Sequence, residues 1–300
     1  RLMSKLKTDK DKYIFNRIWK ATSDMERYVQ YGFTPKERDE IFGRKSWDQF
    51  QVYSFSDLLH KMDGYDNDGD KNDKIEKPTS IRGIVKYYGP FESENITKED
   101  IPERFYSIIN FQNFLLHVLR VQQKEDISLD DKQLLIQFDR YLKDDEKNIS
   151  ENEVEEFVKQ FGYNLLKLKY IFDKFIIKRE FINEKEGWSL KRLKWYEKNR
   201  VSYVNTFSND NQEKDSSFNA NIIMLLSMFH VSAPTQIYKH WLNASLLHCF
   251  SNFNEINDNN CSGKSYKDYL TSLSKSYMLD KYLANEEKEF YDIIYKNHCK

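Results

Sequence analysis

The pattern of apolar and polar positions predicts one long amphipathic helix near the middle of the chain, from Glu151 to Phe181. Ser150 and Glu153 stand three residues apart before an apolar run, which is the spacing of a capping box. Large apolar side chains then recur every three or four residues, at Phe157, Phe161, Leu165, Leu168, Phe172 and Phe175. This period places them on one helix face, and at about 1.5 Å per residue the helix would be roughly 46 Å long.

Signals of helices also occur on both sides of this segment. Thr34, Pro35 and Glu37 together predict a helix start. The apolar run from Asn219 to His230 predicts a buried helix, because it is too short to span a membrane. The segment 201–207 alternates in the manner of a strand. We therefore expect a mainly α-helical chain: a multi-helix bundle organised around the one long helix, with at most minor β structure.

The polar loop from Pro90 to Lys98 is the best candidate for a boundary between two parts of the chain. It predicts an amino-terminal helical subdomain, 1–95, and a main helical domain, 96–300, which contains the long helix 151–181. The chain does not begin with methionine, so we expect it to be the ordered part of a longer protein.

The composition supports a globular helical protein. Hydrophobic residues make up 39% and charged residues 32% of the 300 positions, while the 9 glycines and 5 prolines give few helix breakers. The net charge is −1, so any binding to a polyanion must come from a local patch. Cys249, Cys261 and Cys299 are scattered and odd in number, which favours reduced thiols in a cytoplasmic protein. No apolar run is long enough to cross a bilayer, so no membrane partner is expected.

The segment from Lys167 to Arg200 is the candidate nucleic-acid surface. It holds eleven Lys or Arg residues against five Asp or Glu. Cationic side chains neutralise phosphates, and aromatic rings can stack on exposed bases. The predicted contacts are Lys178, Arg179, Lys191, Arg192, Lys194, Trp195, Tyr196 and Arg200. The alternative is a solvated helix face with Trp188 and Trp195 directed toward the core.

An acidic loop carries alternating carboxylates at Asp66, Asp68, Asp70 and Asp73. Such spacing around a glycine is typical of calcium loops. With Gly69 at the sixth position of an EF-hand, however, Gly64 would stand at the first position and Glu76 at the thirteenth. We therefore predict an acidic surface insertion without a dedicated ion site.

The histidines and cysteines lack the tight pairs of a zinc site. His240 and His248 are eight residues apart, with Cys249 adjacent to the second and Cys261 further on. Zinc ligands ordinarily come in pairs two to five residues apart. No metal ligand and no cofactor is predicted.

No complete catalytic motif occurs in the chain. The nucleophile elbow, the Walker loop and the dinucleotide-binding glycine pattern are all missing. Gly263-Lys264-Ser265 ends like a phosphate loop, but Asp258 stands where that loop needs its first glycine. No catalytic residue is predicted, and the sequence leaves open whether the chain is an enzyme.

Five segments resemble one protein family: FNRIWKATSDMERYVQYGF (15–33), NFLLHVLRVQQKEDISLDDKQLL (113–135), YNLLKLKYIFDKFIIKRE (163–180), GWSLKRLKWY (187–196) and IIMLLSMFHVSAPTQIYKHWLNASL (222–246). Together they are similar to the helical region that follows the amino-terminal domain in large GmrSD-type restriction and phage-defence proteins. The similarity covers most of the chain, and it lies in helical packing segments.

In that family a ParB-like domain carries a D-G-Q-Q-R motif and nucleotide-dependent activity, and an HNH-type domain is the nuclease. Neither motif is present, and His298 near the end has no HNH context. The resemblance implies a scaffold and DNA contact whose partners are DNA and the flanking domains of a longer protein. A homo-oligomer is left open. The alternative is a helical protein–protein interaction module with no nucleic-acid activity, docking an acidic partner or another subunit.

Overall fold

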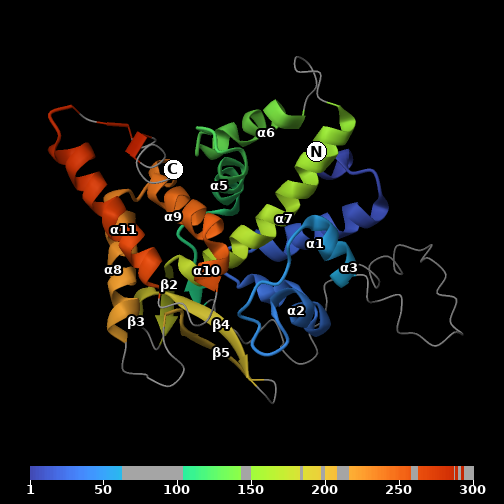
Figure 1. The fold of residues 1–300 in the computed structure, drawn as a ribbon, viewed down its shortest axis with the longest axis horizontal. Coiled ribbons are helices and arrows are strands. Elements are labelled where there is room, and N and C mark those ends of the chain that lie inside the picture. Colours follow the sequence, from blue (N-terminus) through green and yellow to red (C-terminus); the bar gives the residue numbers. More distant parts are fainter. Residues whose placement is uncertain are drawn as a thin grey trace, which may run out of the picture.

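The computed structural model describes residues 1–62, 104–142, 150–182, 185–196, 200–207, 216–257, 263–286, 288–289 and 292–293. Within these ranges the protein is mostly helical (Figure 1). The helices are α1 (Asp9–Ser23), α2 (Pro35–Phe42), α3 (Phe55–Met62), α5 (Phe111–Gln123), α6 (Leu134–Leu142), α7 (Glu151–Phe175), α8 (Ser216–Ser232), α9 (His240–Ser251), α10 (Phe253–Asn257) and α11 (Lys264–Ser276). The strands are β1 (Phe105–Tyr106), β2 (Lys178–Ile182), β3 (Lys185–Ser189), β4 (Lys191–Tyr196) and β5 (Arg200–Asn205).

Helix α7 passes through the middle of the molecule, with α1 to α3 on one side and α8 to α11 on the other (Figure 1). It begins at the predicted capping box: the backbone N–H of Glu153 donates to Ser150 Oγ, and the Glu153 carboxylate accepts from the Ser150 N–H. The helices α1, α3, α5, α6 and α9 pack against it. From Phe161 onward α7 is buried on almost every side, so its polar residues are buried as well.

The long helix ends at Phe175, and the prediction that it continues to Phe181 is wrong. Ile176 has extended backbone angles, φ −111° and ψ 141°. Ile176 and Ile177 are both β-branched and buried, and such residues favour extended backbone. The chain then enters β2, whose polar backbone groups pair with β1 on one side and β3 on the other.

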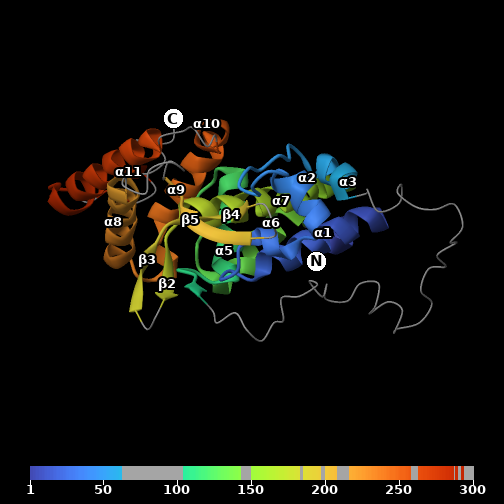
Figure 2. The same ribbon diagram turned by 90° about the horizontal axis from the view of Figure 1, so that it is seen from below.

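The basic segment from Lys178 onward therefore contributes strands to two small antiparallel sheets instead of continuing the helix. One has the strand order β1-β2-β3, and the other is a two-stranded ribbon of β4 and β5. In the ribbon, Lys191 pairs with Asn205 at one end and Tyr196 pairs with Arg200 at the other. The strand predicted at 201–207 is confirmed, as β5. Figure 2 shows β4 and β5 near the middle of the molecule, with β2 and β3 to one side of them.

Helix α8 is the predicted apolar helix, but only one side of it is buried. Ile222, Leu226 and Phe229 are at most 1% exposed, whereas Met224 is 62% and Val231 70% exposed. The expectation of a buried helix therefore holds for the inner face of α8 and is wrong for its outer face. The inner face packs against α11.

Residues 1–62, which belong to the predicted amino-terminal subdomain, share one hydrophobic core with the other described parts of the chain. Ile14 and Phe42 belong to the same buried cluster as Phe172 and Trp241. The predicted boundary at 90–98 and the acidic loop at 63–77 lie outside the described residues.

Candidate functional site

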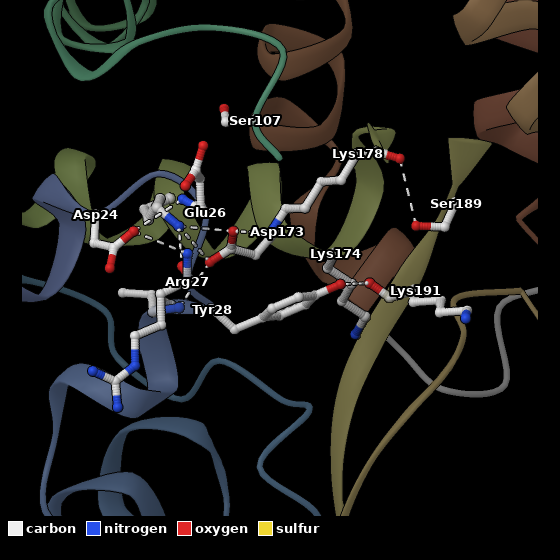
Figure 3. A network of polar contacts seen from close by, with 12 residues as sticks. Asp24, Glu26, Arg27, Tyr28, Ser107, Asp173, Lys174, Lys178, Ser189 and Lys191 are labelled. Carbon is white, nitrogen blue, oxygen red and sulfur yellow. Dashed lines mark hydrogen bonds and ion pairs between the residues drawn. The ribbon is translucent and has the colours of Figure 1, made fainter. Parts of the chain in front are cut away.

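A buried charge cluster lies where α7, β2 and the segment after α1 meet (Figure 3). Its centre is the carboxylate of Asp173, which accepts hydrogen bonds from Lys169 Nζ at 2.8 Å and from Lys178 Nζ at 2.6 Å. The backbone N–H of Val29 donates a further bond, at 2.8 Å. All three ionisable side chains are at most 2% exposed. Two buried ammonium groups therefore share one carboxylate.

The two lysines of this cluster have different second partners. Lys169 donates to the backbone carbonyl of Arg27 at 2.7 Å. Lys178 Nζ lies 3.8 Å from the ring centroid of Tyr28, a cation–π contact. Burial lowers the pKa of Lys178 to about 8, although the Asp173 carboxylate opposes the shift. Lys178 is thus a lysine that releases its proton unusually easily.

A second buried cluster centres on Asp48, between α2 and α7. Lys174 Nζ donates to the Asp48 carbonyl at 2.8 Å and to Asn257 Oδ1 at 3.2 Å. The Arg192 guanidinium lies 3.4 Å from the Asp48 carboxylate. The Tyr170 hydroxyl also donates to the Asp48 carbonyl. These contacts tie β4 to α7 and to the loop after α2.

The space between the two clusters is too small for a water molecule. The polar groups of the two clusters bind one another, and the space between them has no room for a small-molecule substrate. This arrangement therefore has a structural role: its ion pairs and hydrogen bonds fix β2 and β4 against α7. Among the described residues, no three His, Cys, Asp or Glu side chains converge as metal ligands would.

Two of the eight predicted nucleic-acid contacts lie inside these clusters. Lys178 is 1% exposed and Arg192 is 5% exposed. Their charges are directed to Asp173 and Asp48 and not to the surface. The prediction that these two residues contact phosphates is corrected, because a local count of basic residues cannot reveal acidic partners elsewhere in the chain.

Arg179 and Lys191 lie nearer the surface, and each is paired with a glutamate. Arg179 Nη1 is 2.6 Å from Glu186 Oε1, with both side chains about half exposed. Lys191 Nζ is 2.6 Å from the mostly buried carboxylate of Glu180. A phosphate would have to compete with these carboxylates for either cation.

The other predicted contacts come together in the ribbon. Trp195 stacks on Trp47, with ring centroids 5.4 Å apart and planes at 26°. Lys194 Nζ lies 5.2 Å from the ring centroid of Tyr196, which is 40% exposed. Arg200 is the backbone partner of Tyr196. Trp195 thus packs against the hydrophobic core, as the alternative interpretation expected for this ring, but it does so from a strand and not from a helix face. Lys194, Tyr196 and Arg200 lie at the hairpin end of the ribbon.

Sequence reasoning missed a groove of about 430 Å³ between the end of α1 and the start of α5. Asp24, Glu26, Ser107, Asn110 and Gln236 are among its lining residues. They come from three distant segments, so no motif could have predicted the groove. The Asp24 carboxylate accepts from the backbone N–H groups of Glu26 and Arg27, which fixes the turn at the rim.

The histidines that lack zinc spacing have packing and hydrogen-bonding partners in the structure. His240 Nδ1 lies 3.2 Å from Arg120 Nη1. His248 stacks on Tyr269 with centroids 3.9 Å apart, and burial lowers its pKa to about 4. Cys249 is buried, while Cys261 lies outside the described residues.

Comparison of the chain with protein families, curated proteins and solved structures gives no match. Among the helices that the structure describes, none has the length and apolar character needed to cross a membrane.

Proposed function

We propose that this chain is the helical scaffold and DNA-contacting region of a GmrSD-like restriction or phage-defence protein, with nucleotide-hydrolysing and nuclease domains outside it. The scaffold is a helical bundle organised around α7. The DNA contact is the β4–β5 ribbon, because a two-stranded ribbon is one of the elements that the major groove of B-DNA admits. The observation that carries the proposal is that Lys194 and the exposed Tyr196 lie close together at the end of β4, with Arg200 as the backbone partner of Tyr196 in β5.

Some residues of the ribbon anchor it to the rest of the protein, and others are proposed to contact DNA. Arg192 and Trp195 hold the ribbon to the rest of the protein through Asp48 and Trp47, and the backbone N–H of Trp195 donates to the Ser46 carbonyl at 2.8 Å. Side chains two apart on a strand share a face, so Lys194 and Tyr196 lie on the same face. In the proposal Lys194 and Arg200 neutralise phosphates and the exposed Tyr196 ring contacts a base or sugar.

Fluorescence anisotropy with a labelled DNA duplex tests this role. The double variant Lys194→Glu, Arg200→Glu should bind more weakly, and the slope of log affinity against log salt should fall by about 2, because each phosphate contact contributes about 0.9. A matched control is Lys264→Glu with Lys275→Glu, two exposed α11 positions that give the same change in net charge. Equal losses in both double variants, or an unchanged slope in the ribbon variant, would contradict the proposal.

A second candidate function is a helical protein–protein interaction module with no nucleic-acid activity. The observation that favours it is the exposed apolar face of α8, at Met224, Met228 and Val231. Light scattering and pull-down experiments discriminate between the two. A stable oligomer or protein partner without DNA affinity supports the interaction module.

A further inference from the structure

Helix α8 has an outer face that is unusual for a surface helix. None of its 17 residues, SSFNANIIMLLSMFHVS, is Asp, Glu, Lys or Arg. A surface helix ordinarily carries charged side chains on its solvent side, and a helix that is apolar all round is ordinarily buried on all sides. In α8 only the side toward the body is covered. The composition of α8 therefore fits a helix whose outer face is covered by a second partner.

The outer face presents a seam with the spacing of a helix–helix contact. Ala220, Met224, Ser227 and Val231 follow one another at steps of four, three and four residues, which is the spacing of coiled-coil core positions. Ala220, Met224 and Val231 are exposed, and Ser227 is partly exposed. Two of them are small, so another helix backbone can approach closely.

We propose that a second copy of this chain covers the seam, with the two α8 helices antiparallel about a two-fold axis; this rests on the second candidate function above. Antiparallel pairing centred between Met224 and Ser227 places Met224 opposite Ser227 of the other copy. It places Ala220 opposite Val231. Each layer then joins one small and one larger side chain, so the seam is complementary to itself, as a two-fold interface requires.

Charge also favours a second copy over a charged partner. The seam has no charge with which to select an acidic or basic surface. The net charge of the chain is −1, so two copies repel each other only weakly. At about 1.5 Å per residue α8 is roughly 25 Å long. One helix of that length buries less than the roughly 800 Å² per partner of a stable complex, so the dimer should dissociate on dilution.

Sedimentation velocity of the full chain over a range of concentrations gives the first test. The wild-type mass should rise toward that of a dimer, and Met224→Asp should remain a monomer, because it would bury an unpaired carboxylate in the seam. Ser272→Asp is the matched control: it adds the same charge at an exposed position of α11, and it should dimerise like the wild type. Circular dichroism checks that each variant is folded.

Cysteine cross-linking tests the antiparallel arrangement, in a chain whose Cys261 and Cys299 are changed to serine. Ala220 and Val231 are eleven residues apart, about 16 Å along the helix, so they cannot form a disulfide within one chain. The double variant Ala220→Cys, Val231→Cys should give a disulfide-linked dimer on oxidation, and each single variant should not. Cross-linking by Ala220→Cys alone would show a parallel pair and overturn the proposed geometry.

A wild-type chain that stays monomeric at every concentration would overturn the second copy as the occupant. A binding assay with an amphipathic helical peptide that carries a stripe of leucines then distinguishes failure of the dimer from failure of the interaction module. Binding to the wild type but not to Met224→Asp would leave the interaction module standing with a different partner. Absence of binding to both would remove the interaction module as well.

Discussion

At Asp173 the exchange of a single oxygen for an amide nitrogen should lower the stability of the fold strongly. Asp173→Asn keeps the size of the side chain and an oxygen that can accept from the Val29 N–H, but it removes the negative charge. The ammonium groups of Lys169 and Lys178, which lie 2.8 and 2.6 Å from this carboxylate, would then be buried without a counter-charge.

Breaking a buried ion pair by removing one partner costs about 3–5 kcal/mol. Here both cations are at most 2% exposed, so water cannot replace the lost carboxylate. A typical domain has about 5–15 kcal/mol of total stability, so the loss would be a large part of it. We expect the urea midpoint to fall sharply while the slope of the unfolding free energy against urea stays the same.

The double variant Asp173→Asn, Lys178→Met identifies the cause. If the uncompensated positive charge is responsible, removing one of the two cations should restore on the order of 2 kcal/mol. Glu186→Gln is the control, because its pair with Arg179 is about half exposed and such pairs contribute at most about 1 kcal/mol. Urea titrations followed by far-ultraviolet circular dichroism measure all four proteins. A loss below about 1 kcal/mol for Asp173→Asn, or no recovery in the double variant, would refute the role given to this cluster.

Two further predictions concern pH and packing. The pKa of Lys178 in the folded chain, about 8, is below its ordinary value of 10.5, so between these pH values the unfolded chain binds more protons and the unfolding free energy should rise with pH. Lys178→Met should lack this rise, which urea titrations at pH 7.5 and 10 would reveal as a difference on the order of 3 kcal/mol between the two proteins. Gly162→Ala should lose about 1–2 kcal/mol, because the new methyl would lie 2.9 Å from the Phe15 ring and 3.1 Å from the Phe55 ring. Gly187→Ala, which meets nothing within 4 Å, should change little in urea titrations of both variants, and equal losses for both glycines would contradict the packing argument.

Local signals predicted the start of the long helix but not its end. The capping box needs only Ser150 and Glu153, three residues apart, so the sequence contains all of its information. The end at Phe175 depends on β2 pairing with Phe105 in β1 and with Trp188 in β3. The helical period of one segment carries no information about strand partners in other segments, such as Phe105.

In the candidate site, too, the local sequence predicts some features, whereas others depend on residues elsewhere in the chain. Counting basic residues between Lys167 and Arg200 found a cationic segment, but it could not separate Lys178, which faces Asp173, from Lys194 on the ribbon. Burial of Arg192 depends on Asp48, which lies far earlier in the chain. The exposed side of α8 was also missed, because an apolar sequence predicts burial without saying how many neighbours the fold supplies.

The hydrogen bond between Lys169 and the Arg27 carbonyl spans 142 residues, and this separation has a consequence for synthesis in the cell. At about 5–20 residues per second, the ribosome needs roughly 7–30 s to make the chain between those two positions. During that time Ile14, Phe15 and Ile18, all buried in the finished protein, have no α7 to cover them. The nascent amino-terminal segment should therefore be a client of the chaperones that hold apolar chain near the ribosome exit, until the long helix emerges and covers its apolar face.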